Sequence, residues 1–380
     1  MSLRRLLPLL TLLTVTITAC SAPPPVLPIP PTEPLPAATS AAPTASAPPP
    51  ADSASPTAAP PVNLALPAEP YASLDAGPWH LHLLEVNGQN ELWRARADGT
   101  ELGNDPRRVT GALVQFFLPS DLIGGYNPQR DLLAVLTGDI MQSQLNLEIH
   151  DLTNPGAPLT TLNITAGLAR SEATLEPGDP AFEALRALEI SPPVWSPKGD
   201  ALAFMAIIDG PSSDLYTWNA NSGDLARLTD GSGQGVEPHW STEGTYIWHF
   251  AVNSLGTGAG YDMVGVYAAR ADNTKVTDLG LQPTWSAVEF IAWIDDQTVL
   301  TNGWNAGCGP RDIRKVDAAT GRPIVLWSGS FYTANYNPAE RRLDVTVDRF
   351  TAECDPGLVV GSFTVNVDTG EIQQVATSDY

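Results

Sequence analysis

Cysteine and lysine are both scarce in this chain of 380 residues, and each scarcity excludes a class of structure or partner. Only three cysteines are present, too few for the disulfide framework of a small cystine-rich domain. Lysine occurs at Lys198, Lys275 and Lys315 alone, and the formal net charge is −22. A surface this acidic repels phosphate groups, so we expect no binding to nucleic acid and no attraction to an anionic membrane surface. The acidity serves solubility, with attraction of a basic partner or of cations as the alternative.

The chain also lacks an apolar run long enough to cross a membrane as a helix. Its longest apolar stretch, residues 6–17, is shorter than the roughly 20 residues that a spanning helix needs. Arg4 and Arg5 precede the stretch and small residues follow it, which is the layout of a secretory signal. We therefore expect residues 1–19 to be a signal peptide that is removed.

The end of this signal, Ile17-Thr18-Ala19-Cys20, resembles the lipobox of bacterial lipoproteins. The resemblance implies that the Cys20 thiol carries diacylglycerol and that the signal is cut just before it. Several acyl chains together give stable anchoring. We therefore expect a chain held by lipid in the cell membrane or the outer membrane, on the extracytoplasmic side. A non-lipidated signal with an incidental cysteine is the alternative.

A long segment poor in large apolar side chains follows the signal. Residues 20–66 consist mainly of Ala, Pro, Ser and Thr. Such a composition cannot bury a core, so we expect a disordered tether whose prolines favour extended conformations of about 3.1 Å per residue. All ten tryptophans lie at or after Trp79, and we assign residues 67–380 to one folded domain.

Signals of catalysis and of metal binding are missing as well. The chain contains no Gly-x-Ser-x-Gly motif, the signature of an α/β-hydrolase nucleophile. Two histidines share one face of an expected strand, but no carboxylate cluster accompanies them. We expect no metal and no cofactor, and we interpret all five histidines as structural or exposed. They are His80, His82, His150, His239 and His249.

What the chain does contain is a repeat. Pro193-Val194-Trp195-Ser196 returns as Pro238-His239-Trp240-Ser241, and the first copy continues through a Pro-Lys-Gly-Asp turn into an apolar strand. A tryptophan, a tight turn and an apolar strand that recur every 45 residues or so are typical of a propeller blade. The repeat resembles the blades of TolB-type β-propellers, in which strands like Asp214-Leu215-Tyr216 and Arg227-Leu228-Thr229 follow. This resemblance implies an all-β propeller of four-stranded blades.

Weaker copies extend the repeat to six units over about residues 78–380. Their first strands or turns begin at Trp79, Tyr126, Trp195, Trp240, Trp293 and Tyr336. We predict six blades, with five or seven as alternatives. The first unit lacks an inner strand unless residues 62–66 supply it. Between the second and third units, residues 166–190 form an insertion in which Asp179-Pro180 starts a short helix.

The two remaining cysteines, Cys308 and Cys354, follow the second strands of adjacent units. In an exported protein an even pair at matching positions predicts a disulfide. Two free thiols, or a metal-binding pair, are the alternatives.

Loop lengths predict which face of the propeller carries function. The turns between the third and fourth strands are short and marked by glycine, as at Asp98-Gly99, Ser222-Gly223, Thr320-Gly321 and Thr369-Gly370, and they leave no room for a site. The opposite face carries long connections at residues 138–145, 253–262, 302–311 and 349–357. Long loops in compact folds tend to be functional or disordered, so we take this long-loop face as the candidate binding surface.

An aromatic side chain with amides and carboxylates nearby suits recognition of a glycan or a protein. The long-loop face offers six such candidates: Tyr261, Asp262, Trp304, Asn305, Arg311 and Asp312. The structural alternative is that Trp304 covers the disulfide and Asp262 only begins a strand. We expect a monomeric, non-enzymatic binding or scaffold module, with an extracellular polysaccharide-active or other propeller enzyme as the alternative.

Overall fold

The computed structural model describes residues 66–377, apart from 99–106, 115–121, 123, 140–141, 143, 169–178, 256–261, 281–286 and 306. The chain divides into two compact units, Met1–Ala59 and Pro60–Tyr380, and the described residues all lie in the second. No helix among them is long and apolar enough to cross a membrane. The expected signal peptide, Cys20 and the tether before residue 66 lie outside the described residues.

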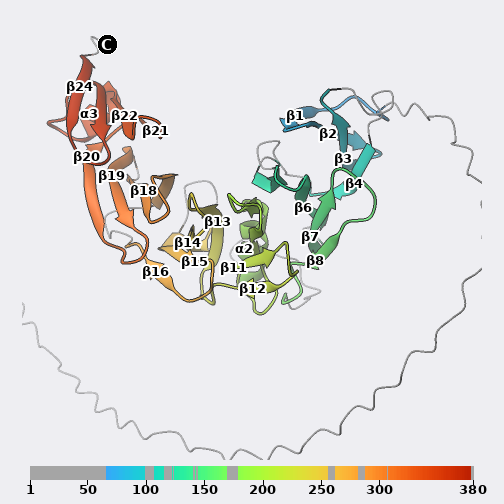
Figure 1. Ribbon diagram of the computed structural model, residues 1–380. Coiled ribbons are helices and arrows are strands. Elements are labelled where there is room, and N and C mark those ends of the chain that lie inside the picture. Colours follow the sequence, from blue (N-terminus) through green and yellow to red (C-terminus); the bar gives the residue numbers. More distant parts are fainter. Residues whose placement is uncertain are drawn as a thin grey trace, which may run out of the picture. The chain divides into compact units, whose positions relative to one another are not determined.

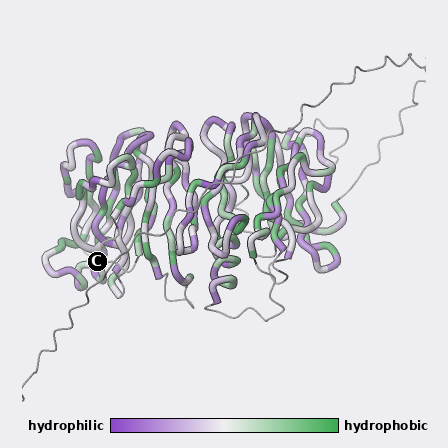
Figure 2. The backbone as a smooth tube through the Cα atoms, turned by 90° about the horizontal axis from the view of Figure 1, so that it is seen from below, coloured by the Kyte–Doolittle hydropathy of each residue, from purple (hydrophilic) through white to green (hydrophobic). Residues whose placement is uncertain are grey.

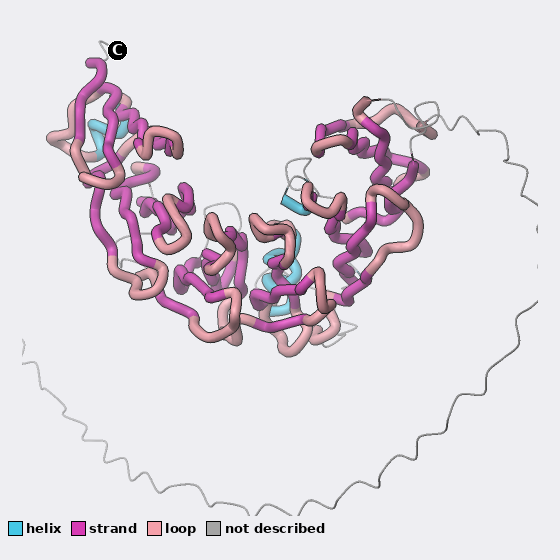
Figure 3. Tube along the Cα trace, in the orientation of Figure 1, coloured by secondary structure: helices cyan, strands magenta, loops and turns pink. Residues whose placement is uncertain are grey.

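Within the described residues, six antiparallel units of four strands follow one another along the chain (Figures 1 and 3). Blade one contains β1 (Ala72–Ala76), β2 (Trp79–Val86), β3 (Gln89–Arg96) and β4 (Arg107–Leu113). Blade two contains β5 (Tyr126–Asn127), β6 (Leu132–Asp139), β7 (Gln144–Asp151) and β8 (Thr160–Asn163). Blade three contains β9 (Val194–Trp195), β10 (Ala201–Ala206), β11 (Asp214–Asn219) and β12 (Leu225–Arg227).

The last three blades have the same order. Blade four contains β13 (Gln234–Trp240), β14 (Tyr246–Ser254), β15 (Asp262–Arg270) and β16 (Val276–Asp278). Blade five contains β17 (Ala287–Trp293), β18 (Thr298–Asn305), β19 (Gly309–Asp317) and β20 (Pro323–Ser330). Blade six contains β21 (Thr333–Asn337), β22 (Arg342–Val347), β23 (Gly361–Asn366) and β24 (Ile372–Thr377). The chain is thus an all-β propeller of six blades, as predicted.

Buried and partly exposed side chains alternate along the strands, and the buried ones form the core between the blades. In β2 the side chains of Trp79, Leu81 and Leu83 are fully buried, whereas the intervening His80 and His82 are half-buried. This is the period of two that an extended strand imposes. In Figure 2 hydrophobic residues lie along the strands and hydrophilic residues gather in the turns.

The repeated tryptophan joins blades three, four and five each to the blade before it. The indole Nε1 of Trp195 donates to the carbonyl of Gly125 at 2.8 Å, and Trp240 Nε1 donates to Val194 at 2.9 Å. Trp293 Nε1 donates to the carbonyl of His239 at 3.1 Å. Each acceptor directly precedes the equivalent aromatic residue of the preceding blade. We call these three bonds the tryptophan links, and they explain why the motif recurs: one side chain fills the core and satisfies a neighbouring backbone group.

The helical insertion is present as predicted. Helix α2 (Pro180–Glu189) follows Asp179, and it buries Leu185 and Leu188. Its Glu183 is also buried and accepts a hydrogen bond from the Leu255 backbone N–H at 2.8 Å, which ties the helix to the end of β14. A buried carboxylate that receives a backbone N–H in this way fixes the position of the insertion.

Two expectations about local structure were wrong. Blade one has its own inner strand: β1 pairs with β2 from Ala72↔Leu83 to Ala76↔Trp79, so residues 62–66 are not needed for it. The connections at 138–145 and 302–311, expected to be long, are short, because the strands on either side extend into these ranges. In the second connection Gly307 and Gly309 both have positive φ, and this conformation lets the chain reverse within three residues.

Candidate functional site

A cavity of about 460 Å³ lies between blades three and four. It is bounded by the start of β11, by the connection between blades three and four, and by β14 and β15 of blade four. This connection runs from the fourth strand of one blade to the first strand of the next, so it lies on the long-loop face. We call this hollow the interblade cavity. It is lined by Ser213, Asp214, Leu228, Thr229, Asp230, Gly231, Ser232, Gly233, Gly235, His249, Ala251, Val264, Tyr267 and Val276.

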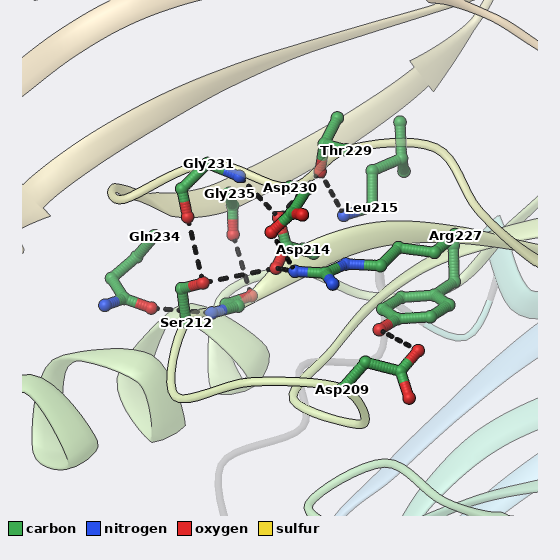
Figure 4. A network of polar contacts seen from close by, with 12 residues as sticks. Asp209, Ser212, Asp214, Leu215, Arg227, Thr229, Asp230, Gly231, Gln234 and Gly235 are labelled. Carbon is green, nitrogen blue, oxygen red and sulfur yellow. Dashed lines mark hydrogen bonds and ion pairs between the residues drawn. The ribbon is translucent and has the colours of Figure 1, made fainter. Parts of the chain in front are cut away.

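Asp214 organises the rim of the interblade cavity (Figure 4). Its carboxylate is 2% exposed and accepts hydrogen bonds from Arg227 Nη2 at 2.7 Å and from Thr229 Oγ1 at 3.0 Å. The Ser212 hydroxyl and the Gly231 backbone N–H complete the set, both at 3.2 Å. A buried carboxylate needs this many donors to offset its lost hydration, so the role of Asp214 is to hold the connection in place.

The crossing from blade three to blade four is fixed by further polar contacts (Figure 4). The Ser213 backbone N–H donates to Gln234 Oε1 at 2.7 Å, and its hydroxyl donates to the Gly235 carbonyl at 3.0 Å. The Gly235 N–H returns a bond to the Ser213 carbonyl at 2.7 Å. These contacts make the rim of the interblade cavity rigid before any ligand enters.

His249 is a polar residue of the interblade cavity that takes no part in this hydrogen-bond network. It is 2% exposed, and its Nδ1 atom has no hydrogen-bond partner among the residues that the structure describes. Burial lowers the pKa of His249 to about 4, although a backbone bond at Ile247 opposes the shift. The imidazole is therefore neutral at physiological pH, and its Nδ1 is buried beneath the surface of the cavity.

Tyr267 forms the aromatic wall beside His249. The two rings stack with centroids 5.6 Å apart and an interplanar angle of 27°. A Cβ atom on Gly265 would lie only 2.1 Å from the Tyr267 hydroxyl oxygen, so glycine at that position leaves room for the ring. With Leu228, Ala251, Val264 and Val276, the ring makes most of the wall apolar. Apolar walls with a few fixed polar groups are characteristic of small-ligand sites.

The residues predicted for the long-loop face do not gather around this cavity. Tyr261 lies outside the described residues, and Asp262 begins β15 as an exposed residue that accepts from Asn253 Nδ2 at 3.3 Å. Trp304 and Asn305 are the last residues of β18 instead of loop residues, and Trp304 is 36% exposed. Their role in binding stays a prediction.

Arg311 and Asp312 belong to β19, where they support neighbouring backbone. Arg311 Nε donates to Asp312 at 3.1 Å, and its Nη2 lies 3.8 Å from Asp355. Asp312, at a positive φ of 52°, accepts the Gly329 N–H at 2.8 Å, and Asp355 accepts the Ser330 N–H at 2.9 Å. Asp312 thus holds β20 against β19, and Asp355 of the next blade binds the last residue of β20, which favours the structural interpretation of both predicted residues.

The predicted disulfide between Cys308 and Cys354 is present, with Cα atoms 5.7 Å apart. Cys308 lies in the turn between β18 and β19. Cys354 ends helix α3 (Arg349–Cys354), which occupies the matching connection of blade six. Asp348 caps this helix and accepts the Thr351 N–H at 2.8 Å. The bond joins blades five and six on the long-loop face.

The face with the short turns also has a cavity, which contradicts the expectation that these turns leave no room for a site. A cavity of about 520 Å³ lies between blades five and six among the glycine-marked turns. Its charged groups have partners within the protein: Lys315 Nζ donates to the Val367 carbonyl at 2.8 Å, and Arg341 Nη2 lies 2.8 Å from Asp368. Because they are satisfied, this second cavity is a weaker candidate than the interblade cavity.

The innermost strands hold one further feature. Burial and the nearby Glu289 raise the pKa of Glu237 to about 6, and Glu237 has a positive φ of 53° at a bulge in β13. Glu289 in β17 accepts a bond from Asn302 Nδ2 at 3.0 Å. In the part of the chain that the structure describes, no group of three His, Cys, Asp or Glu is placed to hold a metal ion.

Sequence reasoning missed His249 and Tyr267 as site residues. The missed signal is the segment Tyr246–Ala251, in which His249 is the one ionisable side chain apart from a tyrosine within a continuous apolar run. A strand that is apolar on both faces is buried on both faces, so its histidine must be buried and neutral. What faces it across the blade boundary cannot be read from spacing.

The comparisons with known proteins concern the fold alone. No protein-family model matches the chain, and no curated protein matches it either. Among solved structures, TolB from Acinetobacter baumannii is similar at 15% identity and a TM-score of 0.38, over 78% of this chain and 63% of that one. A TolB from Agrobacterium tumefaciens is similar at 19% identity and a TM-score of 0.35, over 68% of this chain and 82% of that one.

A third similar structure is the β-propeller domain of the Trilobed protease from Pyrococcus furiosus, at 11% identity and a TM-score of 0.41, over 80% of this chain and 84% of that one. The chain spans less than two thirds of the length of the Acinetobacter TolB. The assignment to a propeller of six blades rests on the structure itself. Blades one and two are joined into one eight-stranded sheet by the pairing of β4 with β6 at Leu113↔Thr137, and each of the other four blades is a separate four-stranded sheet.

Proposed function

We propose that this chain is a lipid-anchored, extracytoplasmic binding module whose ligand enters the interblade cavity. The observation that carries the proposal is the interblade cavity itself, which combines a largely apolar wall with a rim held by the Asp214 contacts. Apolar walls with a few fixed polar groups are characteristic of small-ligand sites. The signal-like first 19 residues and Cys20 support the location.

The rigidity of the rim supports binding rather than a moving, catalytic loop. Asp214 receives four donors, and the Ser213–Gly235 contacts hold the connection from both sides. A site that is formed before the ligand arrives binds without a large ordering cost.

The proposal is tested by blocking the interblade cavity in the full-length protein. Val264 is 43% exposed at its wall, so Val264→Trp fills the space with little cost to folding. We expect this variant to lose the ligands that the wild-type chain retains from panels of uncharged oligosaccharides, anionic oligosaccharides and peptides. Val325→Trp, at a 55% exposed valine of β20, is the matched control and should bind as wild type. If Val264→Trp binds every retained probe unchanged, the cavity is not the binding site.

The pair Glu237 and Glu289 favours the enzyme alternative, because two neighbouring carboxyl groups, one of them with a pKa raised by burial and by the other, are a common acid–base arrangement. The same panels therefore include a measurement of product release at several pH values. Turnover that Glu237→Gln abolishes would replace the binding proposal with an enzymatic one.

A further inference from the structure

Exposed aromatic side chains gather at the long-loop end of blades five and six. Tyr332 and Phe350 are 61% and 58% exposed, and Trp304 is 36% exposed. We call these three side chains the aromatic patch. Single exposed apolar side chains are ordinary at a surface, whereas several at one place mark an interaction site.

Backbone contacts bring two members of the patch close together. Trp304 pairs with Pro310, and the Pro310 carbonyl accepts the Phe331 N–H at 3.0 Å. Two strand spacings and one residue therefore separate Trp304 from Tyr332, so their Cα atoms lie within about 15 Å of each other.

The disulfide brings the third member to the same place. Phe350 lies one helical turn before Cys354 in α3. The bonded partner, Cys308, belongs to the turn that follows Trp304. The patch thus spans the boundary between blades five and six.

The tether contains a segment whose shape fits such a patch. Proline recurs at every third position in Pro25, Pro28, Pro31 and Pro34. A polyproline II helix has three residues per turn, so these four prolines share one face of it. Residues 25–34, which we call the proline segment, would be about 28 Å long in this conformation, enough to cross the patch.

Proline helices dock on exposed aromatic rings because they are already extended and lose little entropy on binding. The charges also match. Glu33 is the one charged residue of the proline segment, and Arg349 lies next to Phe350 with a side chain that is 80% exposed. Arg349 pairs with Glu353 at 3.3 Å, but a surface pair of this kind contributes little, so the guanidinium can turn to Glu33.

We propose that the proline segment docks on the aromatic patch of its own chain. The proposal goes beyond the proposed function and concerns a surface separate from the interblade cavity. Residues 35–65 span on the order of 100 Å when extended, about twice the diameter of a domain of this size, so the segment reaches the patch. The linkage also gives it an effective concentration of roughly 1 mM, which a separate partner seldom attains.

Docking would determine how the domain faces its anchor. Cys20 precedes Pro25 by five residues, which span at most about 18 Å. With the lipid proposed at Cys20, the docked chain turns the long-loop end of blades five and six toward the membrane.

The test uses the full-length exported protein in detergent and replaces tether prolines with serine. One variant changes the four prolines of period three: Pro25, Pro28, Pro31 and Pro34. The matched control changes four others, which lack that period: Pro48, Pro49, Pro50 and Pro56. Both sets lie outside the folded domain. Hydroxyl-radical labelling, read by mass spectrometry, measures the exposure of Tyr332 and Phe350.

We expect the first variant to raise labelling of both residues about fourfold over wild type. A dissociation constant of about 0.3 mM against an effective concentration near 1 mM keeps roughly three quarters of the chains docked. The control variant should be labelled like wild type.

Substitutions in the patch supply the reverse test. Phe350→Ser and Tyr332→Ser should each speed the cleavage of residues 25–34 by a proline-specific endoprotease about threefold, since a tenfold loss of affinity frees most chains. Tyr71→Ser replaces an exposed tyrosine before β1 and should leave the rate unchanged. Circular dichroism and thermal melting establish that each variant folds.

Equal labelling of wild type and the first variant overturns the docking. Protection that the control variant also removes overturns its assignment to the prolines of period three. Protection that disappears on dilution from about 100 μM to 1 μM would show that the tether of a second copy occupies the patch, and it overturns docking within one chain. None of these results bears on the interblade cavity, so the two proposals fail separately.

Discussion

Two histidines in blade four show how strongly the surroundings of a residue change its pKa. Burial lowers the pKa of His249 to about 4, and it does the same for His239, whose ring stacks on Phe290 with centroids 4.1 Å apart. In the unfolded chain both would titrate near the usual pKa of about 6.5. Both are therefore held neutral by packing.

These histidines predict loss of stability in mild acid. Between pH 6.5 and 4 the unfolded chain binds more protons than the folded chain, so the free energy of unfolding falls as pH falls. His249 alone accounts for on the order of 3 kcal/mol over the whole window. The raised pKa of Glu237 acts in the opposite direction between about pH 4.5 and 6, as does the raised pKa of Glu189, while burial also lowers the pKa of His82 and adds to the effect of the two buried histidines.

Denaturant unfolding at pH 7 and pH 5 measures this effect. We expect wild type to be less stable at pH 5, and we expect His249→Gln to show a smaller difference between the two pH values. An equal difference in the two proteins would show that His249 is not held neutral in the folded chain.

At the scale of residues, the sequence could predict the cysteine pair and the strand position of Asp262 but not the site. The cysteines were visible because their spacing follows the repeat. His249 and Tyr267 come together only because β14 and β15 pair at His249↔Tyr267 and because the blade three connection covers them. Contacts across a blade boundary leave no periodic signal in the chain.

Among the elements, the disulfide between the β18–β19 turn and α3 has the largest expected effect on stability. It closes a chain loop with a sequence separation of 46 residues. Loop-closure entropy for that length corresponds to about 4 kcal/mol. The bond joins the long-loop ends of blades five and six, so its loss loosens blade six first.

Replacing Cys354 with serine, or reducing the wild-type protein, should lower the melting temperature and open blade six to protease. Mass spectrometry of the fragments checks where cleavage begins. Reducing agent should leave the Cys308→Ser/Cys354→Ser double variant unchanged, which is the control. Alkylation of both thiols in the untreated exported protein would contradict the bond.

The elements themselves were predictable where the repeat was strong and unpredictable where it was weak. Blades three and four carry Pro-x-Trp-Ser and were recognised directly. Strand β1 was not predicted because Ala72–Ala76 has just one large apolar residue, Leu74. Its position in the sheet comes from its pairing with β2. The short β18–β19 turn was not predicted because Cys308 and the glycines beside it are typical of an irregular loop.

At the scale of the whole molecule, the proposed anchor predicts where the protein is found. Intact-mass measurement of the membrane fraction should show a chain that begins at Cys20 and carries acyl groups. Cys20→Ala should move the protein to the soluble or unprocessed pool, while Cys354→Ser should leave its location unchanged. Membrane retention of Cys20→Ala at the wild-type level would refute lipidation at this residue.

The whole fold could be predicted because one motif, repeated, implies one architecture. The blade number followed from the order of weak copies, and the structure has the same six. The ligand could not be predicted, since propellers of one architecture serve many functions and the site depends on a few side chains.

The tryptophan links have a consequence for how such a chain can change over generations. At three successive boundaries an indole meets the same relative carbonyl of the preceding blade. Deleting blade four as one unit would offer Trp293 the Val194 carbonyl, which is the acceptor that Trp240 now uses. Duplicating a blade would supply a matching donor and acceptor together. The three joints are interchangeable, so this part of the chain can gain or lose whole blades while each of these boundaries keeps its bond.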